Sequence, residues 1–162
     1  MRNYTRNSDL KFYERNRHDT NCGSFALRVN EWYGADDSFE ELEGMDLEEW
    51  IRRGIFEYNL TDYEISNQLA AIFTKQIFRD FDDIRIVKDF SEVENDEELI
   101  AFRTFSWWDG YYDTVDWDFH FMVFRDGEWL EKMGHGPVQP SEDTDEGWGD
   151  YISDTIYFAK KI

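Results

Sequence analysis

The hydrophobic pattern of this chain changes its period once, near residue 80, and this change limits the fold class. Before that point apolar side chains recur at helical spacing, as in Phe25, Val29 and Trp32. After it they alternate with polar ones, which is typical of strands. Helices first and antiparallel strands afterwards predict an α+β domain rather than a parallel βαβ winding.

Two helices stand out in the first half. Asn21 or Thr20 can cap the first, which is predicted to run from residue 22 towards residue 33. Thr61 and Glu64 form a Thr-x-x-Glu capping box that starts the second helix, predicted over 62–78. The second half predicts an antiparallel sheet of about five strands, at residues 84–87, 98–107, 119–124, 128–133 and 155–160.

The length of 162 residues predicts a single domain over 1–162. Residues 1–19 are polar and mildly basic, so we expect an irregular lead-in. Residues 35–50 hold eight acidic residues and no basic one, which predicts a solvated insertion with a short helix near Leu47–Ile51.

The charge and residue types exclude several classes of protein. With 37 acidic against 17 basic residues the net charge is −20, which argues against binding nucleic acid or an anionic membrane directly. Aromatic residues make up 19% of the chain, so a folded core is expected despite the charge. No apolar run is long enough to span a membrane, and no signal peptide is visible, so we expect a cytoplasmic protein. One cysteine excludes a disulfide framework or a Cys-rich zinc site, and we expect neither metal nor cofactor.

Asp126-Gly127 lies in the middle of the alternating run 119–133. This dipeptide is a strong signal for a two-residue type I′ turn, because both turn positions need a positive φ. The turn sets the register so that His120 and Glu131 share a face as diagonal neighbours, roughly 7 Å apart at Cβ. A carboxylate there can accept a hydrogen bond from one imidazole nitrogen and orient the other, as in a catalytic triad.

Cys22 is predicted in the first turn of a helix, where unpaired N–H groups and the helix dipole favour the thiolate. Those N–H groups, together with Asn21, are candidates to bind the oxyanion of a tetrahedral intermediate. The sequence therefore offers a Cys-His-Glu triad of nucleophile, general base and orienting carboxylate, with His135 as the alternative orienting group. Aromatic residues around Asp109-Gly110 are candidates to line a groove: Trp107, Trp108 and Tyr111.

This order of a helix-start cysteine, a strand histidine and a polar orienting group resembles the papain-like fold, especially its small NlpC-like branch. More closely, residues 21–27 and 31–33 are similar to the "NCYAFAL…WY" opening of small proteins of phages and Firmicutes. Residues 118–134 are similar to their "DYHFYR…G.WSHKPG" segment, and residues 151–160 to their final strand. The second histidine of that family is replaced here by Glu131, which can still orient His120.

The resemblance implies N-terminal helices packed on an antiparallel sheet and a thiol hydrolase or acyl transferase. It does not imply a substrate. Our own expectation is a protein or peptide substrate with an amide or isopeptide bond. A phage origin would place the protein in the cytoplasm of a bacterial host.

Each of these residues also fits a purely structural role. A lone cysteine is commonly a small buried hydrophobe, and His120 fits a hydrogen-bonded core histidine among its apolar neighbours. A buried Glu131 needs a partner in either case, because an unpaired buried carboxylate is costly. His135, between two glycines, fits an exposed loop, and the groove aromatics fit packing beneath a loop.

The acidity suggests a second class of function. A net charge of −20 exceeds the magnitude of about 2–8 that is ordinary for a small domain. Acidic side chains on a rigid surface can imitate the phosphates of DNA. The alternative function is therefore a non-enzymatic inhibitor of the anti-defence or anti-CRISPR type, which occupies the basic groove of a host nucleic-acid-binding protein. The candidate surface consists of Asp36, Asp37, Glu40, Glu41, Glu43, Asp46, Glu48 and Glu49.

Overall fold

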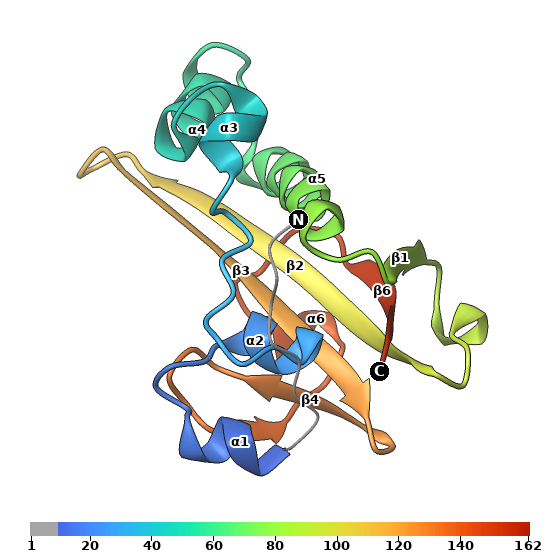
Figure 1. Ribbon diagram of the computed structural model, residues 1–162. Helices are drawn as coiled ribbons and strands as arrows, with labels where there is room; N and C mark the ends of the chain where they lie inside the picture. Colours follow the sequence, from blue (N-terminus) through green and yellow to red (C-terminus); the bar gives the residue numbers. More distant parts are fainter. Residues whose placement is uncertain (1–9) are drawn as a thin grey trace.

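A computed structural model describes residues 10–162. These residues form an α+β architecture with an open antiparallel sheet of strand order β1-β6-β2-β3-β4-β5. Figure 1 shows the long hairpin of β2 and β3 running through the molecule, with α3 and α4 near its turn. The expected α+β class is confirmed, and the sheet has six strands rather than about five.

The helices within the described residues are α1 (Leu10–Arg15), α2 (Cys22–Leu27), α3 (Phe39–Glu43), α4 (Leu47–Phe56), α5 (Asp62–Asp80) and α6 (Asp145–Trp148), with a short 3-10 helix at Phe90–Glu92. The strands are β1 (Ile84–Val87), β2 (Glu97–Asp109), β3 (Thr114–Arg125), β4 (Glu128–Lys132), β5 (Val138–Pro140) and β6 (Ile156–Lys161). None of these helices combines the length and the apolar character needed to cross a bilayer.

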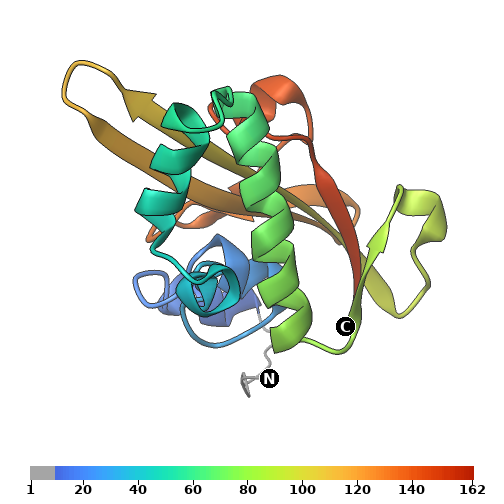
Figure 2. The same cartoon turned by 90° about the horizontal axis from the view of Figure 1, so that it is seen from above.

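Helix α5 begins where the capping box predicts. The Thr61 hydroxyl accepts the backbone N–H of Glu64 at 3.1 Å, and the Glu64 carboxylate accepts that of Thr61 at 3.2 Å. The helix presents the predicted apolar stripe to the sheet, and Figure 2 shows it crossing over the strands with α4 beside it. The stripe packs into the main core against the alternate residues Ile100 and Phe102 of β2.

Helix α2 is shorter than predicted, because it ends at Leu27 instead of continuing to residue 33. Arg28 adopts a left-handed conformation with φ 59°. The N–H of Val29 then bonds back to the carbonyl of Ser24 at 3.0 Å, which closes the helix as a Schellman motif. The three apolar residues predicted to share one face of this helix therefore do not do so. Phe25 and Val29 are buried, but Trp32 is 44% exposed.

The expected irregular lead-in at 1–19 contains helix α1, so this prediction is wrong for residues 10–15; residues 1–9 lie outside the described part. Tyr13 of α1 is buried and donates its hydroxyl to the carbonyl of Val29 at 3.0 Å. Its ring meets Phe25 edge-on, with centroids 5.3 Å apart. The burial of one tyrosine thus fixes α1 against α2.

The acidic segment 35–50 is more ordered than predicted. It contains α3 and the first turn of α4, which continues to Phe56 rather than stopping near Ile51. Phe39 and Leu47 enter the main core while the acidic side chains around them face outward. The segment is therefore a helical layer with one apolar side rather than a solvated insertion.

The sheet is covered on both faces near its centre. Alternate residues of β2 and β3 point to α5 and α2, and the intervening ones contact Trp148 of α6. Strand β5, which was not predicted, adds an edge strand by pairing Gln139 with Glu131 of β4. Both β2 and β3 extend further than predicted, towards the turn at residues 110–113.

Candidate active site

The Asp126-Gly127 turn forms as predicted. Asp126 and Gly127 have φ values of 54° and 84°, and Arg125 stands opposite Glu128. In this register His120 and Glu131 share a face of the sheet, and Nε2 of His120 lies 2.8 Å from Oε2 of Glu131. The sequence therefore predicted this contact correctly from the turn.

The Glu131 carboxylate is held at both oxygens. Oε1 accepts the side-chain amide of Gln139 at 3.1 Å, so β5 supports the pair from the far side. Burial alone would raise the pKa of Glu131, but the hydrogen bonds from His120 and Gln139 outweigh burial and lower it. Glu131 is therefore an anion at neutral pH and a suitable acceptor for an imidazole N–H.

His120 is clamped by two aromatic side chains that sequence reasoning did not identify. The ring is 3% exposed, and Tyr151 stacks on it with centroids 5.3 Å apart and an interplanar angle of 28°. Trp148 meets the same ring edge-on at 5.8 Å. Both residues follow the hairpin in a turn-rich segment, and no local pattern indicates that this segment returns to the sheet.

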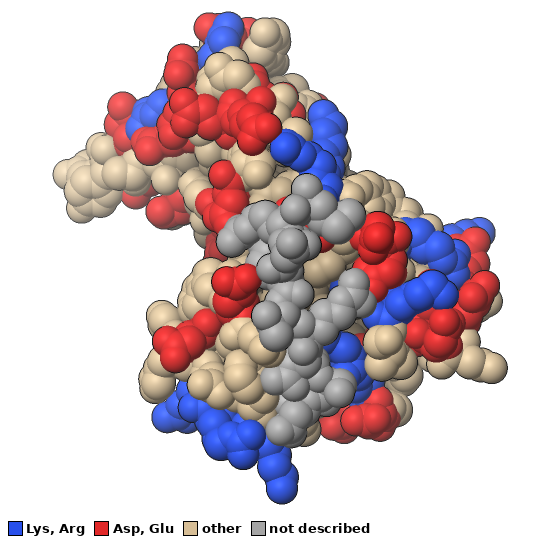
Figure 3. All heavy atoms as spheres, viewed as in Figure 1, with Lys and Arg blue, Asp and Glu red and all other residues tan. Residues whose placement is uncertain are grey.

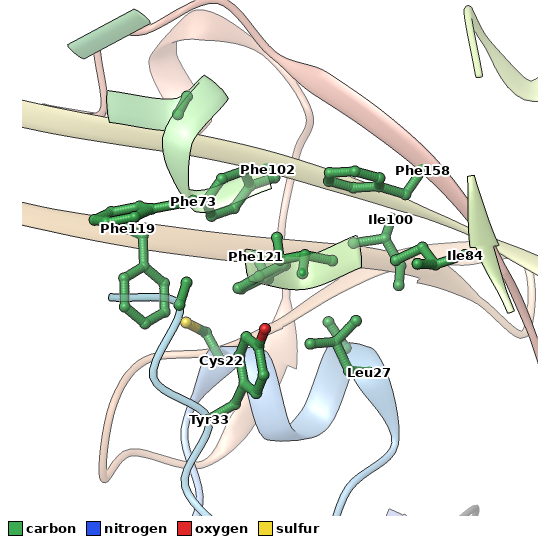
Figure 4. Packing of buried hydrophobic residues seen from close by; sticks show 14 of the residues in the cluster. Cys22, Leu27, Tyr33, Phe73, Ile84, Ile100, Phe102, Phe119, Phe121 and Phe158 are labelled. Carbon is green, nitrogen blue, oxygen red and sulfur yellow. The ribbon is translucent and has the colours of Figure 1, made fainter. Parts of the chain in front are cut away.

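Cys22 is the first residue of α2 and is 6% exposed. Figure 4 shows it at the margin of the main core, with its sulfur on the side of Phe119. Among the described strands, β4 pairs with β3 only over Val123–Arg125. The edge of β3 next to His120 is therefore not paired with β4, and helix α2 packs against β3 instead. Cys22 of α2 and His120 of β3 line the same cleft at that edge.

The electrostatics of His120 reflect this meeting. Burial disfavours the imidazolium, but hydrogen bonding to Cys22 and to Glu131 outweighs burial and raises the pKa of His120 to about 9. Because Nε2 faces Glu131, Nδ1 is the nitrogen left for the thiol. The three side chains of the predicted triad are thus in one place.

Asn21 fixes the start of α2. Its side-chain oxygen accepts the backbone N–H groups of Ser24 at 3.0 Å and Tyr33 at 3.1 Å, and its amide donates to the Tyr33 carbonyl at 2.8 Å. The Asn21 side chain therefore caps helix α2 and joins the start of this helix to the backbone of Tyr33. The side chain of Asn21 thus positions the helix that bears Cys22. Its predicted role in binding an oxyanion stays a prediction.

The end of α2 is fixed by a buried ion cluster. Glu98 of β2 accepts two hydrogen bonds from Arg28 at 2.9 Å and two from Arg125 at 2.8 and 2.9 Å. Arg125 also donates to the Phe25 carbonyl at 3.2 Å and lies over the Phe25 ring. Charge-assisted pairs of this kind lock the geometry of the helix that bears Cys22.

Lys132 ties the segment before α2 to the sheet. Its side chain is buried, and its ammonium donates to the backbone carbonyls of Arg17, Thr20 and Gly134. Burial lowers the pKa of Lys132, and the nearby charge of the Cys22 thiolate opposes that shift. The ammonium also donates to the carbonyl of Thr20, two residues before Cys22, which brings a positive charge to the start of α2.

His135 lies apart from the triad. It is exposed, its Nδ1 donates to the carbonyl of His18 at 2.8 Å, and its ring lies 4.9 Å from that of Trp32. Glu131 contacts the His120 imidazole. The carboxylate therefore takes the orienting role for which His135 was the alternative.

A cleft of about 450 Å³ opens beside Cys22 and His120. The side chains that form its walls are mainly aromatic or acidic: Trp32, Trp117, Phe119, Tyr151, Asp36 and Asp118. The aromatic residues predicted for a groove do not line it, because they lie near the turn of the β2–β3 hairpin. Trp107 borders another pocket, Trp108 packs edge-on against Phe56 at 5.1 Å, and Tyr111 is 87% exposed.

Acidic side chains gather over α3 and α4, as Figure 3 shows. Six of the eight acidic residues between 36 and 49 are exposed. Glu41 pairs with Arg79 of α5 at 3.0 Å, and Asp46 caps α4 by accepting the N–H of Glu49. Across residues 10–162, no group of three or more His, Cys, Asp or Glu side chains is arranged to hold a metal ion.

Comparisons of the chain with protein-family models, with curated proteins and with solved structures found no match.

Proposed function

We propose that this protein is a papain-like cysteine hydrolase that cleaves an amide or isopeptide bond. The observation that carries the proposal is the 2.8 Å contact between His120 and Glu131, on an imidazole that lines the same cleft as Cys22. A nucleophile, a base within reach and a third group that orients the base are the recurring parts of covalent acyl transfer.

The first half-reaction begins when the Cys22 thiol gives its proton to His120, because the pKa of His120 is raised to about 9 and the imidazole holds a proton at neutral pH. The Cys22 sulfur attacks the carbonyl carbon, a C–S bond forms, and the carbonyl electron pair moves to oxygen. The backbone N–H of Cys22 has no acceptor within the helix and would bind this oxyanion. Collapse breaks the C–N bond, and His120 gives its proton to the leaving amine.

The second half-reaction releases the acyl group. His120, now neutral, takes a proton from water, which attacks the thioester; the C–S bond breaks and the thiolate and imidazolium return. The sum is amide plus water giving a carboxylic acid and an amine. An acceptor amine in place of water would make the same site an acyl transferase. Glu131 stabilises the imidazolium in both half-reactions.

Alkylation of Cys22 by iodoacetamide between pH 4 and 9 tests this proposal, since Cys22 is the only cysteine. We expect fast labelling near neutral pH, because a thiol paired with an imidazole reacts as the thiolate. The rate should collapse in His120→Ala and persist in His135→Ala, a matched control at a histidine outside the triad. Slow labelling that appears only on unfolding would refute the proposal.

The second candidate is the acidic inhibitor, and the exposed acidic residues over α3 and α4 favour it. Such a protein would bind a basic groove with an affinity that falls as salt is added. Binding that survives Cys22→Ala and is lost when Glu40, Glu41 and Glu48 are replaced by Gln would support this function over catalysis.

A further inference from the structure

We propose that the cleft beside Cys22 takes a substrate with a lysine or arginine side chain next to the scissile bond, held between Asp36 and Asp118. This inference rests on the proposed hydrolase function and names its substrate class. The two carboxylates come from different segments: Asp118 from β3, and Asp36 from the connection between α2 and α3.

Asp118 is fixed with its charge beside the reacting groups. It lies two residues before His120 on β3, so both side chains point to the same face of the sheet. Its Oδ1 accepts the N–H of Phe119 at 2.7 Å, and its Oδ2 accepts the hydroxyl of Tyr151 at 2.9 Å. Tyr151 in turn stacks on His120. A carboxylate with one donor on each oxygen keeps lone pairs for a ligand cation.

Asp36 lines the same cleft as Asp118 and interacts with it electrostatically. Burial raises the pKa of Asp36, and the negative charges of Asp37 and Asp118 raise it further. Among the described residues that line the cleft, none is lysine or arginine, and the His120 imidazolium is already paired with Glu131 at 2.8 Å. A bound ammonium or guanidinium would supply the missing positive charge to both carboxylates.

The walls fit the rest of a basic side chain. Trp32 and Trp117 line the same cleft. Aliphatic stems of lysine and arginine pack along aromatic rings, and their charged ends gain from the ring quadrupole. The net charge of −20 also attracts basic substrates over longer distances.

Besides the His120 imidazolium, the positive charge that opposes this preference is the ammonium of Lys132, which donates to the carbonyl of Thr20, two residues before Cys22. Its donors are directed at three backbone carbonyls, and it is not part of the cleft wall. The proposal therefore requires the two carboxylates to outweigh Lys132 at the point where a reagent approaches the sulfur.

Charged thiol reagents measure that balance. Trimethylammonioethyl and sulfonatoethyl methanethiosulfonate are similar in size and opposite in charge, and both form a disulfide with Cys22. Both reagents react with the same thiolate, so the ratio of their rates does not depend on the fraction of Cys22 that is ionised. The uncharged reagent methyl methanethiosulfonate measures that fraction separately. We expect the cationic reagent to react at least about tenfold faster, and the ratio to shrink at high salt.

Substitutions then assign the effect to the cleft. Asp118→Asn and Asp36→Asn should each reduce the ratio about threefold or more, as expected for removing a nearby unit charge. Glu128→Gln changes the net charge by the same amount at an exposed site outside the cleft, and it should leave the ratio almost unchanged. Circular dichroism spectra that match the wild type show that the variants fold.

Equal rates for the two reagents, or a faster anionic one, would overturn the proposal. So would a ratio that falls as much in Glu128→Gln as in Asp118→Asn, because the preference would then come from the overall charge. Failure of the hydrolase proposal has a different signature: labelling by iodoacetamide would not depend on His120, whatever the charge ratio.

Discussion

The substitution Glu98→Gln tests the cluster that fixes α2. The variant keeps the shape of the side chain and removes the charge that Arg28 and Arg125 share. All three side chains are largely buried, with Arg125 and Glu98 about 8% and 9% exposed. Breaking a buried pair by removing one partner costs about 3–5 kcal/mol, because the other charge stays buried without compensation.

Urea unfolding followed by circular dichroism measures this cost. With a slope of about 2 kcal/mol/M, the expected loss moves the midpoint down by about 2 M. The control is Glu41→Gln, which removes a carboxylate from an exposed pair with Arg79 and should cost less than about 1 kcal/mol.

The pH dependence follows from Glu98 itself. Burial raises its pKa, but the hydrogen bonds from Arg28 and Arg125 outweigh burial and lower it. A carboxyl with a lowered folded pKa stabilises the fold above its unfolded value of about 4.3 and loses that contribution as the pH falls through the folded value. Wild type and Glu98→Gln should therefore converge in acid. Equal stabilities at pH 7, or a gap that widens in acid, would refute the reasoning.

Three further predictions use the same unfolding assay. First, the pKa of His120 is raised to about 9 in the folded protein. The imidazolium therefore adds about 3 kcal/mol to the free energy of unfolding below pH 6.5, and this stabilisation is lost as the pH rises through 9. In His120→Gln the stability should change less with pH between about 6.5 and 9. Second, Lys132→Met leaves three carbonyls without their shared donor and should cost about 2–3 kcal/mol, with slower alkylation of Cys22. Third, Gly127→Ala should cost about 1 kcal/mol from φ alone, since nothing lies within 4 Å of the added methyl group; no change in the urea midpoint would contradict this.

Local signals predicted the parts of the fold that depend on local chemistry. The Thr61–Glu64 box started α5 at the correct residue, and Asp126-Gly127 set the register that joins His120 to Glu131. In each case the determining contacts lie within a few residues of each other, so the sequence states them directly.

The errors come from contacts between distant residues. Arginine rarely ends a helix in the left-handed conformation, and Arg28 is held near Glu98, which lies far along the chain. Tyr151 and Trp148 reach His120 only after the chain has returned past the sheet. Strand β5 has three residues and ends in proline, so its pattern is too short to recognise.

The order of the chain also determines when the candidate site can exist during biosynthesis. Cys22 leaves the ribosome before His120, Glu131 and Tyr151. A nascent chain that lacks the β3–β4 hairpin holds an ordinary thiol, without the imidazole that would activate it. Under the proposed function, Cys22 would therefore gain its catalytic partner only after this hairpin has been made, and a chain truncated before the hairpin would lack the proposed pair.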